Sequence, residues 1–161
     1  MTTPTLTDYL KYANLQMAAE AFIRDPLTNV LSGSGDDLAQ ALKAGNNHAS
    51  VFTATQAQDF TDPTKGWTVL DQRANTSSGF SGTLFKNNTT GELVISFRST
   101  EFIDDAVRDS LATNTLEIFD TGFAWGQLAD MEKWYADLRK EGGALNGKSF
   151  SVISSMSLPI S

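Results

Sequence analysis

The sequence contains no cysteine, and this absence excludes several kinds of site at once. Without thiols the chain has no disulfide framework, no thiol nucleophile and no thiolate metal ligand. Histidine is almost as scarce, because His48 is the single one among 161 residues. Since the common zinc sites need several histidine or cysteine ligands, and the carboxylates show no ligand spacing, the sequence predicts neither a metal site nor a cofactor.

Positively charged residues are also scarce. The chain carries 12 lysine and arginine residues against 19 aspartate and glutamate residues, which gives a formal net charge of −7. No local cluster of basic residues offsets this excess. Because the resulting field repels DNA, RNA and anionic membranes, we expect no nucleic-acid partner.

Long apolar runs are missing as well. No segment approaches the 18 or more apolar residues of a membrane-spanning helix, so the sequence predicts no transmembrane segment. The first residues, Met1 to Thr5, lack the charged and apolar regions of a signal peptide. We expect secretion by a route that does not read an N-terminal signal, with a cytoplasmic location as the alternative.

The composition that remains is that of a globular domain, with 40% hydrophobic and 10% aromatic residues. The N-terminal part reads as three helices. Thr5 opens a capping-box pattern, and apolar residues at helical spacing then predict a helix from about Thr7 to Ile23. Similar signals predict a second helix over 36–43 and a third that Thr53 caps and that ends at Phe60.

The central part changes to the alternation that is typical of strands. Three segments show it, Trp67 to Arg73, Phe80 to Lys86 and Leu93 to Phe97. Turn-forming residues between Asn87 and Gly91 join the last two segments. The sequence therefore predicts a three-stranded antiparallel meander.

The last part predicts a long helix over Gly122 to Lys140 and a short buried strand over Ser149 to Ile153. This order of elements indicates a right-handed crossover to a parallel strand. The helix carries an apolar stripe, which the core of the chain explains more readily than a partner protein does. The stripe consists of Trp125, Leu128, Met131, Trp134, Tyr135 and Leu138.

Two groups of residues invite a catalytic interpretation but have simpler ones. His48 lies in a polar loop, where a lone histidine is more often a solvated surface residue than a catalytic base. Asp104 and Asp105 resemble a carboxylate pair, but adjacent helical residues point to different faces. Acidic residues in a first helical turn also interact favourably with the helix dipole, so we prefer a structural role for both.

The end of the strand at Phe97 carries a stronger signal, because the hydroxyl residues Ser99 and Thr100 follow it directly after Arg98. One interpretation is that a hydroxyl residue caps the next helix. The other is an oxyanion hole, in which a backbone amide and the Thr100 hydroxyl stabilise a negatively charged oxygen. From the residues alone, both interpretations remain open.

A family resemblance favours the second interpretation. The segments 93–100, 103–105 and 120–123 resemble the N-terminal half of class 3 lipases, which are α/β-hydrolases. More narrowly, Asp8 to Val152 resembles the lipase-like domain of large bacterial secreted proteins with calcium-binding glycine-rich repeats. The resemblance implies an ester or lipid substrate, a serine acyl-enzyme mechanism and an oxyanion role for Thr100, with Ser99 in the place of the family's usual glycine.

The chain departs from the family after Val152. The family carries G-x-S-x-G there, whereas residues 153–161 contain no glycine. Ser157 keeps a Ser-Leu pair, but it lies one position late and Pro159 follows soon after, so it is a weak candidate nucleophile. No acid and no histidine follow it, and His48 precedes it.

We therefore expect a single lipase-like domain over residues 1–152 and a divergent tail over 153–161. The fold class is α/β, an incomplete α/β-hydrolase-like domain with N-terminal helices, the meander and a parallel strand. Such a chain is expected to be inactive alone, as a truncation or as a divergent product. The alternative is a non-catalytic binding or structural module that forms a homodimer through the exposed edge of its last strand.

Overall fold

A computed structural model of the chain describes residues 3–46, 51–73, 76, 78–97 and 125–154. Three helices come first, followed by three strands, a long helix and a fourth strand. Their bounds are α1 (Leu6–Glu20), α2 (Gly35–Ala44), α3 (Ala54–Phe60), β1 (Trp67–Arg73), β2 (Gly82–Asn87), β3 (Leu93–Phe97), α5 (Trp125–Arg139) and β4 (Ser151–Ser154).

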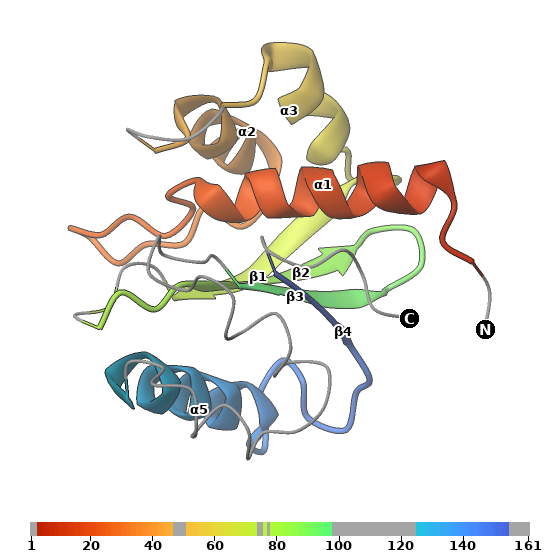
Figure 1. Cartoon of the computed structure of the whole chain (residues 1–161). Coiled ribbons are helices and arrows are strands. Elements are labelled where there is room, and N and C mark those ends of the chain that lie inside the picture. Colours follow the sequence, from red (N-terminus) through yellow and green to blue (C-terminus); the bar gives the residue numbers. More distant parts are fainter. Residues whose placement is uncertain (1–2, 47–50, 74–75, 77, 98–124, 155–161) are drawn as a thin grey trace.

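The described strands form one mixed sheet in the order β1-β2-β3-β4. The first three strands pair antiparallel and β3 pairs with β4 in parallel, which confirms both the meander and the parallel partner. Helices α1, α2 and α3 cover one face of the sheet and α5 covers the other (Figure 1). The fold is therefore α/β, and no helix in its described part is long and apolar enough to cross a membrane.

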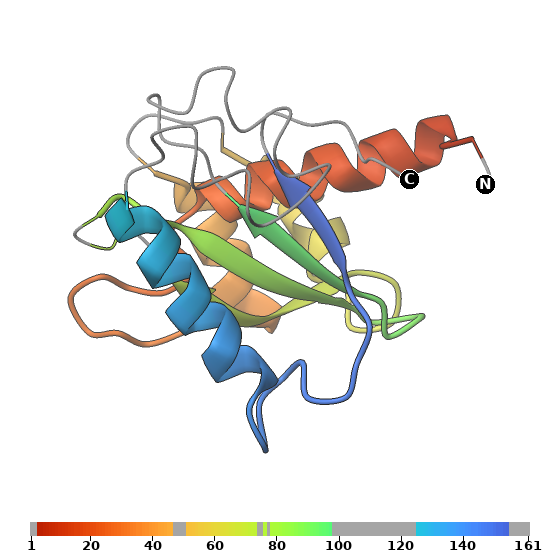
Figure 2. The ribbon, with the colours of Figure 1, turned by 60° about the horizontal axis from the view of Figure 1, so that its bottom comes forward.

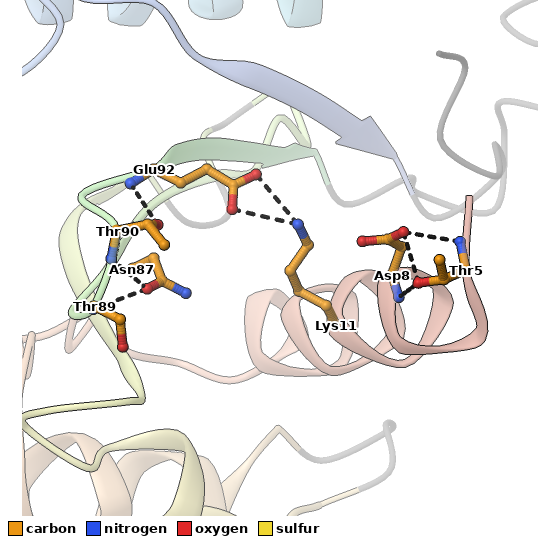
Figure 3. A network of polar contacts seen from close by, with 7 residues as sticks. All are labelled: Thr5, Asp8, Lys11, Asn87, Thr89, Thr90 and Glu92. Atoms are coloured by element: carbon orange, nitrogen blue, oxygen red, sulfur yellow. Dashed lines mark hydrogen bonds and ion pairs between the residues drawn. The ribbon is translucent and has the colours of Figure 1, made fainter. Parts of the chain in front are cut away.

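Helix α1 begins as the sequence predicts and extends past the sheet at its N-terminal end (Figure 2). Its capping box is complete, because the Thr5 side chain accepts from the Asp8 amide while the Asp8 carboxylate accepts from the Thr5 amide (Figure 3). The periodic residues that predict this helix are not all buried, since Leu6 is 76% and Leu10 58% exposed. Leu15, Ala18 and Ala19 anchor α1 to the core instead.

Helix α1 also ends three residues before the predicted Ile23, at Glu20, and a distant side chain explains why. The buried Gln72 carboxamide oxygen accepts from the amides of Ile23 and Arg24 at 2.9 and 2.8 Å. Its Nε2 donates to the carbonyl of Ala21 at 3.1 Å. Because these bonds satisfy the backbone outside the helix, the chain leaves the helical path early.

The strand bounds agree closely with the sequence pattern, with two differences. Strand β2 begins at Gly82 rather than at Phe80, because the Phe80 amide donates to the Thr76 hydroxyl within a local turn. Strand β4 begins at Ser151 rather than Ser149 and runs to Ser154. Ile153 lies in the strand, as the predicted strand has it, and the sheet also includes Ser154, so the expected start of the divergent tail at 153 is wrong.

An apolar cluster packs on each face of the sheet. Helices α1, α2 and α3 pack against residues such as Phe85 and Val94, while α5 packs against Leu84 and Ile95. Trp134 of α5 is 1% exposed, so it belongs to the chain's own core, as the core interpretation of its stripe predicts. The close approach requires Gly82, because a Cβ there would lie 2.5 Å from the Trp134 ring.

Asp71 connects the two faces of the sheet. It follows an irregularity in β1 at Val69/Asp71, and one of its carboxylate oxygens forms an ion pair with Arg24. The other oxygen accepts from the Trp134 indole N–H at 2.7 Å. Arg24 in turn donates from Nε to the carbonyl of Gln72 at 2.8 Å. One carboxylate thus holds both the N-terminal segment and α5.

We expect Asp71→Asn to lower the free energy of unfolding by about 1–2 kcal/mol, because the charge that pairs with the partly buried Arg24 is lost. Chemical denaturation at neutral pH measures this change. The matched control is Asp137→Asn, whose ion pair with Arg73 spans 3.8 Å between side chains that are each 45% exposed. Its effect should stay below about 0.5 kcal/mol. Equal effects of the two variants would contradict a special role for Asp71.

Candidate functional site

The candidate site lies at the edge of the sheet where β3 and β4 end. Phe97 and Ser154, the last residues of these parallel strands, are register partners. Gly82 pairs with Phe97 on its other side, and Arg73 pairs with Gly82. The carboxyl ends of two adjacent parallel strands therefore meet, which is where α/β proteins usually bind their substrates.

The residues with proposed catalytic roles follow these strand ends in the sequence. Ser99 and Thr100 come shortly after β3, and Ser157 comes shortly after β4. All three lie outside the described residues, as does His48. The carboxylate pair Asp104 and Asp105 falls outside as well. The described part of the chain brings together the two strand ends that precede the candidate oxyanion and nucleophile segments.

Three aromatic rings form an apolar wall beside the end of β3. The Phe80 ring centroid lies 5.9 Å from those of both Phe97 and Trp134, and the centroids of Phe97 and Trp134 are 6.3 Å apart. Tilted and edge-to-face contacts of this kind are favourable and fix the rings in place. Phe80 and Trp134 are buried and Phe97 is partly exposed, so of these three rings Phe97 is the one that offers apolar surface next to the strand end.

A polar cluster joins the loop between β1 and β2 to α5 near the same edge. The Ser78 hydroxyl donates to the Asp130 carboxylate at 2.6 Å and shares a 2.9 Å hydrogen bond with the Thr76 hydroxyl. Gly126 allows the helix to come this close, since a Cβ there would lie 3.0 Å from the Ser78 Cβ. Sequence reasoning missed the cluster, because Ser78 and Asp130 are 52 residues apart and share no local pattern.

The chemistry of this cluster suits positioning rather than catalysis. Hydrogen bonds from the side chains of Ser78 and, secondarily, Thr76 lower the pKa of the Asp130 carboxyl. A general base that activates a serine works best with a pKa near the operating pH, and a carboxyl with a lowered pKa is a weak base. We therefore interpret Asp130 as the tether that holds the loop before β2 against α5.

A row of polar side chains runs across three neighbouring strands close to the candidate site. Thr83 is the register partner of both Gln72 and Ser96, and its hydroxyl accepts from the Gln72 carboxamide at 3.0 Å. Ser96 is 1% exposed, and its hydroxyl has no hydrogen-bond partner within the described chain. This row of polar side chains therefore ends at the buried Ser96 hydroxyl, one residue before the end of β3. The same strand leads to Ser99 and Thr100.

Comparison with known proteins assigns no family. No protein-family model matches the chain, and no curated protein matches it either. In the part of the chain that the structure describes, no group of three or more histidine, cysteine, aspartate or glutamate residues could hold a metal ion. The geometry of the strand ends and the sequence motifs that follow them are therefore the features that point to a function.

We expect Ser78→Ala to raise the pKa of the Asp130 carboxyl toward its ordinary value, because the strongest hydrogen bond to the ionised form is lost. An NMR titration of side-chain carboxyl carbons measures this pKa. Asp25 serves as the control, since backbone amides of Thr28 and Leu27 lower its pKa and the substitution leaves them in place.

The same hydrogen bond links stability to pH. Because folding lowers the pKa of Asp130, its ionised form stabilises the fold above the unfolded pKa, and this contribution is lost as the pH falls through the folded value. The stability difference between the natural chain and Ser78→Ala should therefore shrink in acid. A difference that is constant from neutral to acidic pH would show that Asp130 is not the partner that matters.

Proposed function

We propose that this chain corresponds to the N-terminal part of a lipase-like α/β-hydrolase domain, a family that hydrolyses carboxylic esters such as acylglycerols. The observation that carries the proposal is the parallel pairing of Phe97 with Ser154. It supports the proposal because the segment with Ser99 and Thr100 and the segment with Ser157 begin at neighbouring positions of one sheet edge. In such a hydrolase the oxyanion hole and the nucleophile must face one substrate carbonyl.

The reaction of the family gives each segment a task. A serine oxygen attacks the ester carbonyl carbon while a base takes the serine proton, and the carbonyl oxygen becomes an oxyanion. In our proposal the Thr100 hydroxyl and a nearby backbone amide donate hydrogen bonds to that oxyanion. The carbon–oxygen bond to the alcohol then breaks, and the alcohol leaves with the proton. Water hydrolyses the acyl-enzyme in a second step of the same kind.

The residues of this chain do not complete that reaction. The sequence contains no G-x-S-x-G motif. Its single histidine, His48, precedes the strand that this motif would follow. Ser157 lacks the flanking glycines of that motif. We therefore propose that the chain holds the oxyanion half of a hydrolase site and is inactive by itself.

We expect the purified chain to hydrolyse p-nitrophenyl butyrate no faster than its Ser157→Ala variant, and neither to exceed the uncatalysed rate. The physical reason is that a serine without an adjacent base is a weak nucleophile at neutral pH. Release of p-nitrophenolate measures the rate. Activity that disappears in Ser157→Ala would contradict the absence of a working triad, whereas equal activity in both would exclude Ser157 and point to another site.

Because the chain has no cysteine of its own, engineered pairs can test whether the two segments meet. We expect the double variant Thr100→Cys with Ser157→Cys to be cross-linked within one chain by a short bis-maleimide. The matched control combines Thr100→Cys with Ser149→Cys, an exposed position just before β4, at the far end of the strand. Mass spectrometry after proteolysis identifies the linked peptides. Preferential linkage in the control pair would contradict the proposed site.

A second candidate function, self-association without catalysis, is favoured by the position of β4. This strand is the outermost one of the described sheet on its side, and Val152 within it is 46% exposed. The backbone of such an outermost strand can pair with a strand of a second copy of the chain. This alternative predicts a dimer in light scattering that Val152→Lys dissociates, whereas a stable monomer excludes it.

A further inference from the structure

A cavity of about 350 Å³ lies between α1, α3 and the start of β1. Trp67, which lines it, is the first residue of β1 and pairs with Asn87 at the end of β2. The candidate catalytic edge is at the other end of these strands, where Arg73 pairs with Gly82. The cavity is therefore a separate place in the fold, and its volume is at the lower end of the range of small-molecule sites.

The floor of the cavity is apolar and already fixed by ring contacts. Phe52, Phe60 and Trp67 line it, and each is less than 9% exposed. The Phe52 and Phe60 ring centroids are 5.4 Å apart, and Phe60 and Trp67 both pack edge-on against Phe85 at 6.0 and 6.5 Å. Because the rings hold one another, the floor needs no ligand to form.

Helix α1 supplies an opposite wall that is still exposed to solvent. Leu10 of α1 lines the cavity and is 58% exposed. An apolar ligand on the ring floor would cover this leucine as well. Burial of exposed apolar surface is the main source of affinity for such a ligand.

Lysine side chains line the cavity and can meet an anion. Lys11 and Lys65 line it together with Asp59, and Glu92 beside Lys11 makes these four charges sum to zero, so an exposed lysine and not a net positive field attracts the anion. Lys11 also binds Glu92, with Nζ 3.3 Å from both carboxylate oxygens (Figure 3). Partial burial alone would lower the pKa of Lys11, but Glu92 and Tyr12 raise it, so the amine stays charged. Lys65 is exposed and is the cation best placed to meet a ligand.

We infer that this cavity binds a small carboxylate with a linear apolar tail. The tail lies on Phe52, Phe60 and Leu10, and the carboxylate meets Lys65 at the mouth. At roughly 30 Å³ for each non-hydrogen atom the cavity holds about a dozen of them, which is the size of decanoate. The cavity would bind such a ligand whether or not the chain hydrolyses esters, so this inference and the proposed function fail separately.

Titration calorimetry with decanoate tests the inference on the natural chain. We expect one binding site with a dissociation constant on the order of 0.1–1 mM. Each methylene removed from the tail should weaken binding by about threefold to fourfold. Decyltrimethylammonium has the same tail with the opposite charge and should bind at least several-fold more weakly. Absence of decanoate binding, or tighter binding of the cation, would overturn the inference.

Exposed substitutions locate the site without disturbing the core. Asn14→Phe fills the cavity from α1 and should abolish binding, while Ala13→Phe adds the same ring at the adjacent exposed position, which is not part of the lining, and should leave binding unchanged. Lys65→Gln should weaken decanoate binding by about threefold to fivefold, and the distant exposed Lys148→Gln should not. Thermal unfolding confirms that each variant folds. Equal binding by Asn14→Phe and Ala13→Phe would show that decanoate binds elsewhere.

Discussion

The parallel pairing of β3 with β4 determines where the last strand and the candidate site lie in this fold. The antiparallel strands β1, β2 and β3 follow one another along the chain and in the sheet, but a parallel strand requires the chain to return to the other end of the sheet. Helix α5 lies on that return path and covers the face opposite α1, α2 and α3 (Figure 1). Strand β3 is an inner strand because β2 and β4 pair with it on either side. Because both faces of the sheet are also covered, its Val94 and Ile95 side chains are almost fully buried. The same pairing brings the carboxyl ends of β3 and β4 to one edge.

Two consecutive polar residues of β1 determine how the layers are positioned relative to one another, whereas the apolar contacts stabilise the layers without positioning them. Apolar burial is non-directional, whereas the Gln72 carboxamide binds Ala21, Ile23 and Thr83 through directed hydrogen bonds. Asp71 joins the N-terminal segment to Trp134 of α5. Both residues lie near the end of β1, at the edge where β3 and β4 also end. The interactions that order the layers therefore lie close to the candidate site.

Local signals predicted the parts of the fold that local physics controls. The capping residues Thr5 and Thr53 and the bounds of β1 and β3 are confirmed. The early end of α1 could not be predicted, because it depends on Gln72 about 50 residues away. For the same reason the tether between Ser78 and Asp130 and the exposure of Leu10 were not visible in the sequence. The expected parallel partner of β3 is confirmed, while the roles of Ser99, Thr100 and Ser157 remain predictions.

The candidate site requires that β3 and β4 pair in parallel with Phe97 opposite Ser154. Nuclear Overhauser contacts between backbone protons of the two strands measure this pairing. We expect contacts that link 94–97 to 151–154 in the same chain direction, with the protons of Ser96 close to those of Ile153. Contacts in an antiparallel pattern, a shifted register, or none between these strands would contradict it, because the segments after Phe97 and Ser154 would no longer begin at the same edge.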